Sequence, residues 1–213
     1  MFNKIKKTLY IPLYGIIALA IMLVINFSTY IGNRLITANM AHHDLSLPVD
    51  DMIPFVKEFI IIYVIVAYVQ WIAGYYIIGK QEKRLCIYIV TAEIIAKLIT
   101  LICFLSLPCE IKRPDIVDTD FMSRFVKWVY DTDPPSNLFP SIHCLESLII
   151  ARTSLKLENV PKWYPPVTII TSVLVCASTL LVKQHFFVDV IGAIVVVEIG
   201  LFVSGKLPWT KES

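Results

Sequence analysis

Apolar and polar positions alternate along this chain in long blocks rather than in the short periods of a soluble helix or strand. A block of about 20 apolar residues is long enough to cross the hydrocarbon core of a bilayer as a helix. The pattern therefore predicts an all-α, polytopic membrane protein with six transmembrane helices in one bundle, over Leu9–Ile31, Phe55–Ile78, Leu85–Leu107, Leu138–Leu155, Pro166–Val182 and Phe186–Val203.

Composition agrees with a membrane protein and excludes other classes. The chain is 57% hydrophobic, and its mean hydropathy of +0.71 places it in the bilayer. No linker-like tract interrupts it, so residues 1–213 are expected to form a single domain. A net charge of +2 is too small to indicate a nucleic-acid partner. The sequence does not determine the oligomeric state.

Lysine and arginine positions predict the orientation. With a cytoplasmic N-terminus, the inner segments hold 11 of the 19 basic residues, the outer segments hold 7, and Lys97 lies within the membrane. Both termini of this multi-pass protein, expected in the cell membrane, are then cytoplasmic. The same topology brings the loop with Lys112 and Arg113 to the extracytoplasmic face, together with the starts of the fourth and sixth helices.

Two short histidine segments stand at the starts of those helices, at residues 139–143 and 183–189. Ionisable side chains where a membrane helix meets water are costly unless they serve a function. Asp189 follows His185 by four residues, so on a helix its carboxylate can accept the Nδ1–H of His185 and leave Nε2 facing the site. Lys183 lies just upstream and can neutralise a phosphate.

The first histidine segment supplies the complementary groups. A helix N-terminus is a natural anion site, Ser141 adds a hydroxyl, and His143 lies where it can protonate a leaving oxygen. These groups predict a phosphomonoester site, in which His185 attacks phosphorus and His143 is the general acid. The alternative is that the two histidines are polar residues of helix packing.

At these residues the chain resembles the type 2 phosphatidic acid phosphatase superfamily, the membrane lipid phosphatases related to vanadium haloperoxidases. The family pattern is K-x6-R-P, P-S-x-H and S-R-x5-H-x3-D, and it is matched here at Arg113-Pro114, at Pro140, Ser141 and His143, and at Ser178, His185 and Asp189. The resemblance implies six transmembrane helices with the site within 108–189, and no metal or organic cofactor. It also implies that His185 forms a phosphohistidine, Asp189 orients it, His143 is the acid, and Ser141 and Arg113 bind phosphate.

Two positions depart from the family pattern. The expected lysine is Ser106 and the expected arginine is Thr179, so two cationic phosphate ligands are missing. Lys112 and Lys183 are the candidate replacements. With these departures the chain also resembles the inositolphosphorylceramide and sphingomyelin synthase-like branch, in which a lipid alcohol accepts the phosphoryl group.

The predicted function is hydrolysis of a lipid phosphate or diphosphate at the extracytoplasmic face. Headgroup transfer to a lipid alcohol is the alternative, and a non-catalytic membrane protein of the same fold is the third possibility. Asp131 and Asp133 form an Asp-x-Asp pair without a third ligand at motif spacing, so no metal site is expected. Glu93 and Lys97, four residues apart, are expected to pair, and Glu146 to contact either His143 or a neighbouring helix.

Overall fold

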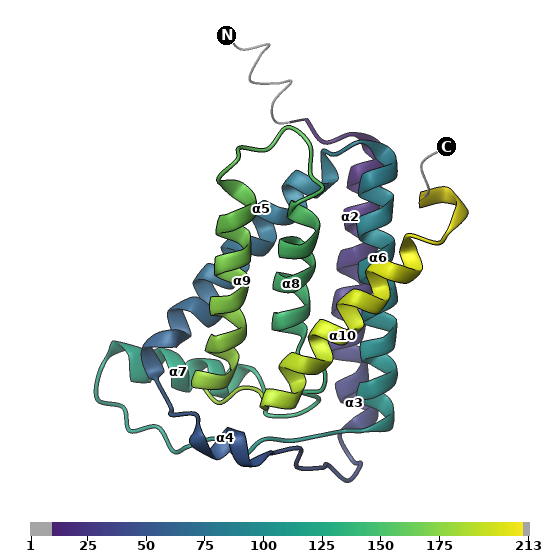
Figure 1. The fold of residues 1–213 in the computed structure, drawn as a ribbon. Coiled ribbons are helices and arrows are strands. Elements are labelled where there is room, and N and C mark those ends of the chain that lie inside the picture. The colour runs from purple at the N-terminus through teal and green to yellow at the C-terminus, as the bar shows by residue number, and fades with distance from the viewer. Residues whose placement is uncertain (1–9, 211–213) are drawn as a thin grey trace.

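The computed structural model describes residues 10–210, which fold as one helical bundle without a β-strand in that range. Figure 1 shows long helices running between two ends of the bundle, with α8 at its centre. The elements, in chain order, are α2 (Leu13–Phe27), η1 (Ser28–Gly32), α3 (Asn33–Thr37), α4 (Pro48–Met52), η2 (Lys57–Phe59), η3 (Ile62–Val66), α5 (Ala67–Gly79), α6 (Lys83–Ser106), α7 (Phe121–Thr132), α8 (Ile142–Ser154), α9 (Tyr164–Leu181), α10 (Phe187–Ser204) and η4 (Pro208–Thr210).

Six helical segments correspond to the six predicted blocks, but within residues 10–210 only five are long and apolar enough to cross a bilayer: Leu13–Thr37, Lys57–Gly79, Lys83–Ser106, Tyr164–Leu181 and Phe187–Ser204. The fourth, α8, has 13 residues and is therefore about 20 Å long, against a hydrocarbon core of about 30 Å. The prediction of six full spans is thus not confirmed. Helix α8 can be short because α5, α6, α9 and α10 pack around it.

Two of the long segments contain a π-helical turn. η1 joins α2 to α3, and η3 precedes α5. A π-turn adds a residue to one turn of a helix, which redirects the side chains there, and such turns are frequent at functional sites. Tyr30 lies in η1 and Tyr63 lies in η3, and both tyrosines point into the interior described below.

The long segment between α6 and α8, expected to be an acidic loop, contains the additional helix α7. The side chain of Asp120 caps its first turn by accepting a hydrogen bond from Ser123 N at 2.9 Å. Val126 and Val129 of α7 are buried on its inner face, whereas Phe121 and Trp128 of the same helix are exposed. Sequence reasoning overlooked this amphipathic helix because its charged face resembles a solvated loop. It lies across the end of the bundle where α8 and α10 begin (Figure 1).

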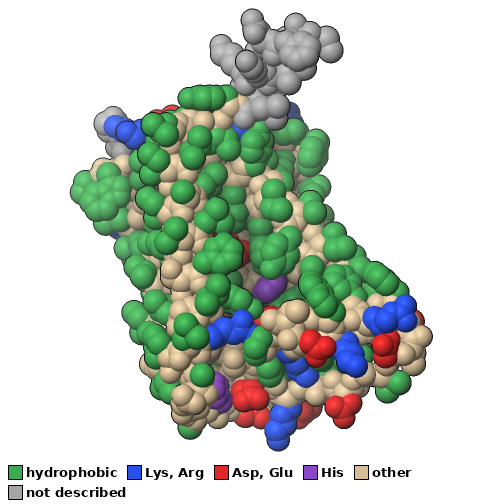
Figure 2. All heavy atoms as spheres, turned by 180° about the vertical axis from the view of Figure 1, so that it is seen from behind, with side chains coloured by type: hydrophobic (Ala, Val, Ile, Leu, Met, Phe, Trp, Pro, Cys, Tyr) green, Lys and Arg blue, Asp and Glu red, His purple; other side chains and the backbone are tan. Residues whose placement is uncertain are grey.

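The surface of the bundle has an apolar flank and a charged end. Figure 2 shows hydrophobic side chains over the flank, with acidic and basic side chains gathered at the end where α4 and α7 lie. The described chain begins and ends at the opposite end of the bundle (Figure 1). The basic residues Lys4, Lys6, Lys7 and Lys211, which entered the orientation argument, lie outside the described residues.

Candidate active site

The two histidine segments meet at the charged end of the bundle. The backbone N–H of Ser141 donates to the carbonyl of Asp189 at 3.1 Å, which joins the start of α8 to the start of α10. Gly192 permits this approach, because a Cβ there would lie 2.5 Å from the ring of Phe139. The ring centroids of His143 and His185 are consequently 6.4 Å apart. The predicted convergence of the two segments is present.

Asp189 orients His185 as the spacing predicted. Its Oδ2 lies 3.0 Å from Nδ1 of His185 and also accepts the N–H of Phe186 at 2.9 Å, so the carboxylate caps α10 as well. The backbone N–H of His185 donates to Thr179 O at 3.1 Å, at the end of α9. With Nδ1 engaged, Nε2 is the ring nitrogen left for chemistry. Burial lowers the pKa of His185, but the hydrogen bond and charge of Asp189 outweigh it, so the pKa lies above its ordinary value.

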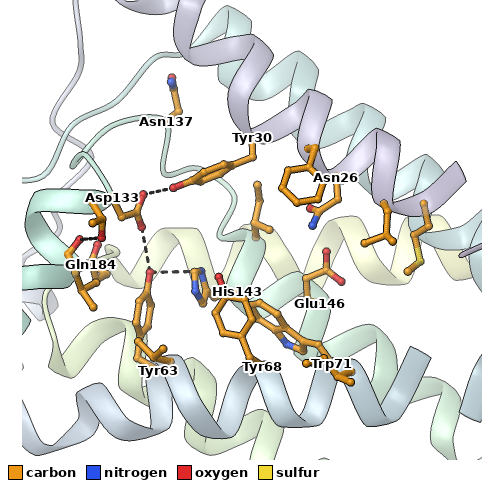
Figure 3. Close-up of a pocket in the computed structure, with 18 of the residues that line it drawn as sticks. Asn26, Tyr30, Tyr63, Tyr68, Trp71, Asp133, Asn137, His143, Glu146 and Gln184 are labelled. Carbon is orange, nitrogen blue, oxygen red and sulfur yellow. Dashed lines mark hydrogen bonds between the residues drawn. The ribbon is translucent and has the colours of Figure 1, made fainter. Parts of the chain in front are cut away.

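His143 is held differently. Its ring stacks on Tyr63, with centroids 4.1 Å apart and planes 16° apart. Its Nδ1 lies 3.4 Å from the Tyr63 hydroxyl, which donates to Oδ2 of Asp133 at 3.5 Å. Tyr30 donates to Oδ1 of the same carboxylate at 2.5 Å. Figure 3 shows this chain of contacts from Tyr30 through Asp133 and Tyr63 to His143.

Sequence reasoning did not assign Tyr63 or Asp133 to the site. Asp133 stood in an acidic loop, and Tyr63 stood inside an apolar block with no motif around it. The only local signal for Tyr63 is a hydroxyl near one end of a membrane span. No pattern in the chain links it to a histidine 80 residues later.

Arg113 is brought to the site through Gln184. Its Nη1 donates to the carbonyls of Tyr130 at 3.1 Å and Asp133 at 2.7 Å, and its Nη2 donates to Oε1 of Gln184. Arginine can only donate, so the contact fixes the orientation of the Gln184 amide. The NH2 group of Gln184 is buried without a hydrogen-bond partner among the described residues. Gln184 lines the same cavity as the histidines.

The other predicted phosphate ligands are not brought to that cavity. Ser141 is fully buried, and its Oγ accepts the N–H of Cys144 at 3.4 Å as the N-cap of α8. Lys183 adopts φ 51° after α9, and its Nζ donates to the carbonyls of Asp50 at 2.9 Å and Ile53 at 2.6 Å. The side chain of Lys112 is exposed.

The two positions where the family has cations contribute hydroxyl groups that bond their own helices. Ser106 Oγ donates to Ile102 O at 2.7 Å, and Thr179 Oγ1 donates to Cys176 O at 2.8 Å. Both bonds satisfy the hydroxyl locally, as is common for serine and threonine within helices. Neither position supplies a charge to the site.

A cavity of about 770 Å³ opens beside the histidines. His143, His185 and Gln184 lie in its wall, and the remainder includes apolar and aromatic side chains of α2 and α5 together with residues of α6, α7 and α8. Figure 2 shows a histidine side chain in a hollow among the hydrophobic side chains of the flank. Cavities of this size and lining accommodate drug-sized or lipid ligands.

A buried ionic cluster adjoins the same cavity, whose wall includes Asn26, Tyr75 and Glu146. Lys97 forms an ion pair with Oε1 of Glu146 and donates to Oδ1 of Asn26 at 2.7 Å. Tyr75 donates to the other oxygen of Glu146. Of the expected pair of Glu93 with Lys97 only a Coulombic interaction is present, because both oxygens of Glu93 are buried without a hydrogen-bond partner among the described residues. Lys97 forms its ion pair with Glu146 instead, because the packing of α8 against α6 places the Glu146 carboxylate beside the lysine. Glu146 thus contacts neighbouring helices, one of the two expected outcomes.

Within residues 10–210, no group of three His, Cys, Asp or Glu side chains is placed to hold a metal ion.

Comparisons with known proteins identify the family of this chain. No curated protein and no solved structure matches the chain. A family model described as the PAP2 superfamily matches residues 54–203, which include both histidine segments, Arg113 and the helices that position them. The chain belongs to the PAP2 superfamily.

Proposed function

We propose that this protein transfers the phosphoryl group of a lipid phosphate ester through a phosphohistidine on His185, with water as the acceptor. Membership of the PAP2 superfamily supports a phosphatase-type function on lipid phosphates in general. The observation that carries the specific proposal is the 3.0 Å contact between His185 Nδ1 and Asp189. It commits Nδ1 to the carboxylate and leaves the Nε2 lone pair beside a cavity large enough for a lipid headgroup.

The two histidines divide the reaction. Nε2 of His185 attacks phosphorus and forms the N–P bond while the P–O bond to the leaving alcohol breaks. His143, whose ring centroid lies 6.4 Å away, gives its proton to the departing oxygen. In the second half, His143 accepts a proton from the incoming water, and the P–N bond breaks.

The non-bridging oxygens of the phosphate need donors. The NH2 group of Gln184 is suited to this, because it is buried, unpaired among the described residues and one residue from His185. Arg113 donates to the oxygen of the same amide and so fixes its orientation. Removing one preorganised donor from such a site typically costs a factor of about 100 to 1,000 in rate.

Transfer to a lipid alcohol is the second candidate function. The observation that favours it is the extent of the cavity, which continues past the histidines between α2 and α5 along apolar side chains. The acceptor in a hydrolase is a water molecule and needs little space, whereas the lining of this cavity offers space for the acyl chain of a second lipid. The acceptor alcohol would then take the place of water in the second half of the reaction.

His185→Ala tests the proposal directly. In detergent, this variant should lose at least about 1,000-fold in turnover of any lipid phosphate that the wild-type protein consumes. The matched control is His42→Ala, which alters a loop histidine that lies outside the cavity wall. Wild-type rates in the His185→Ala variant would remove the phosphohistidine from the mechanism.

A labelled substrate separates the two acceptors. With radiolabelled phosphate, the wild-type protein should carry label that is stable to base and labile to acid, as a phosphohistidine is. A chase with water alone releases inorganic phosphate if the protein is a hydrolase. Release that requires an added lipid alcohol instead assigns it as a transferase.

The side of the membrane is also part of the proposal. The bias of basic residues, 11 against 7, supports an extracytoplasmic site. A protease site inserted between α3 and α4, in the loop at the site end, should be cleaved from outside intact cells. Protection of that loop, with cleavage only after the cells are opened, would invert the orientation.

A further inference from the structure

Helix α7 carries a row of aromatic rings on its surface. We name this row, formed by Phe121, Phe125 and Trp128, the aromatic ridge. Consecutive ring centroids lie 6.1 and 5.8 Å apart, and the spacing of four and three residues places the rings on one face of the helix. Phe121 is 62% exposed and Trp128 is 56% exposed. An apolar patch of this kind on a surface marks a contact with a protein or a membrane.

The other two faces of α7 differ from the ridge. Val126 and Val129 are buried against the bundle, in one cluster with Ile60 and Val182. The third face is charged, and its exposed residues are Arg124, Lys127 and Asp131. Large apolar rings on one side and lysine and arginine on another are typical of helices that lie in the plane of a membrane interface.

Two contacts set the height of α7 relative to the membrane-spanning helices. Asp120, which caps its first turn, forms an ion pair with Lys57, the first residue of the span that contains α5. Towards the other end of α7, the Tyr130 hydroxyl donates at 2.8 Å to the carbonyl of Val182, the residue after α9. Figure 1 shows α7 across this end of the bundle. Both contacts join α7 to a point where a span begins or ends, which is the level of the membrane surface.

The bilayer is the partner that this height makes available. Aromatic side chains, tryptophan above all, are enriched where lipid headgroups meet acyl chains. The ridge also adjoins the apolar flank of the bundle, because Trp128 shares the cavity wall with Tyr68 and Ile72, two exposed residues of the α5 span. Exposed side chains of a span face lipid. The same lipid therefore reaches the ridge.

The far end of α7 leads to the site. Asp133 follows the last residue of α7 and accepts a hydrogen bond from the hydroxyl of Tyr63, which lies 3.4 Å from Nδ1 of His143. Asp133 also lines the cavity. Whatever holds α7 in place therefore also holds the carboxylate that supports His143.

We propose that α7 anchors the site to the bilayer. The aromatic ridge enters the boundary between headgroups and acyl chains in the leaflet on the site side, and this contact keeps the Asp133 end of α7 beside Tyr63. The rings are removed from water on insertion, which stabilises this position of the helix. The insertion itself is independent of the proposed function, whereas its effect on turnover rests on that function.

Fluorescence quenching tests the insertion without any turnover. Trp128→Phe removes the indole of the ridge, and Phe121→Trp in that background adds one indole at a ridge position outside the cavity wall. Both variants are reconstituted in phosphatidylcholine vesicles whose acyl chains carry bromine near the headgroup, and their difference gives the emission of the added indole. We expect bromine to lower that emission at least about twofold and aqueous iodide to have little effect, as for a residue in the interface.

Lys127→Trp in the same background is the matched control, because it places the indole on the charged face of the same helix. It should show the opposite pattern, with quenching by iodide and little quenching by bromine. Quenching of the Phe121→Trp indole by iodide but not by bromine overturns the proposal. Protection of that indole from both quenchers would assign the ridge to a contact with another protein chain and also overturns it.

Phe121→Ser tests what the insertion does for the site. In vesicles, this variant should lower kcat for an alkyl phosphate ester of a lipid about fivefold, because Asp133 then supports His143 less well. The loss should disappear for an aryl ester, whose leaving group needs no proton, and Phe121→Trp should restore the wild-type rate. Lys127→Ser is the control and should stay within about twofold of the wild-type protein.

The outcomes separate the anchor from the proposed function. An unchanged kcat in Phe121→Ser, or equal losses on alkyl and aryl esters, overturns the link from the ridge through Asp133 to His143. If the wild-type protein turns over no lipid phosphate while bromine quenches the Phe121→Trp indole, the proposed function fails and the insertion of α7 stands. If turnover depends on His185 while bromine has no effect, the function stands and the anchor fails.

Discussion

The two histidines of the site differ in how a carboxylate supports them. His185 contacts Asp189 directly at 3.0 Å, whereas His143 reaches Asp133 only through the hydroxyl of Tyr63, over 3.4 and 3.5 Å. A direct carboxylate fixes the tautomer and raises the basicity of an imidazole, which suits a nucleophile. A neutral phenol holds the ring without adding a charge next to it, which suits a group that must release its proton.

The difference extends to how each support is built. Asp189 lies four residues from His185 and also caps α10, so one helical turn provides the contact. The support of His143 needs η3, the loop after α7 and α8 to meet, since Tyr63 and Asp133 come from separate segments. The nucleophile is therefore supported by local structure, and the acid by the tertiary fold.

The largest expected effect comes from breaking the direct support. Asp189→Asn should lower kcat by about 1,000- to 10,000-fold, because the neutral amide removes the negative charge that raises the basicity of His185. The amide oxygen can still accept the Phe186 N–H, so the helix cap survives. The measurement is kcat on the lipid phosphate that the wild-type protein consumes fastest, with Asp131→Asn, at an exposed position of α7, as control. A loss below about tenfold would show that the charge of the carboxylate is not needed to activate His185.

The pH profile of the same variant sharpens the comparison. His185 must be neutral to attack, and its raised pKa in the wild-type protein means that activity falls as the pH drops through that value. Without the charge of Asp189 the pKa falls, so the acid limb of the Asp189→Asn profile should move to lower pH. The direction of this pKa shift also determines how the stability of the protein depends on pH. Stabilisation from the protonated His185–Asp189 pair is complete below the unfolded pKa of histidine and is lost as the pH rises through the folded value.

Gln184→Leu tests the phosphate donor beside the nucleophile. We expect kcat to fall about 100-fold, because one preorganised N–H donor is lost at nearly constant volume. In Gln184→Glu the side chain can still accept from Arg113 but cannot donate to the phosphate, so kcat should fall at least as far. Wild-type rates in both variants would move the phosphate donors to another part of the site.

Tyr63→Phe breaks the indirect support and should lower kcat about tenfold. The ring that stacks on His143 remains, and only the hydroxyl between Nδ1 and Asp133 is removed. If His143 protonates the leaving oxygen, the effect should disappear for an aryl ester, whose leaving group needs no proton. Tyr68→Phe is the control, since its ring touches His143 only by its edge, at 6.5 Å. Equal losses on alkyl and aryl esters would contradict the acid role.

The smallest expected effect is that of Lys183→Gln. Because Nζ binds the carbonyls of Asp50 and Ile53, the variant should change kcat less than about threefold while losing about 1 kcal/mol of stability. Thermal unfolding and activity of the same preparation separate these effects. A loss of turnover of about 100-fold at unchanged stability would restore the phosphate-binding role predicted for this lysine.

Local patterns in the chain were enough to predict the helical class, the approximate bounds of six segments, and the pair of His185 with Asp189. These follow from the length of apolar blocks and from residues one helical turn apart, which are local properties. The motifs also indicated the family, because their order and spacing are written in the chain.

The choice of side chains that face the cavity came from the packing of the whole bundle. Packing turned Lys183 to the carbonyls of another segment, gave Lys97 to Glu146 instead of Glu93, and placed Tyr63 and Asp133 beside His143. Such contacts depend on how helices far apart in the sequence rotate and cross, and a π-turn alone changes which residue faces inward. The physical reason is that helix periodicity fixes neighbours within one turn, whereas partners across helices are set by how the helices pack together.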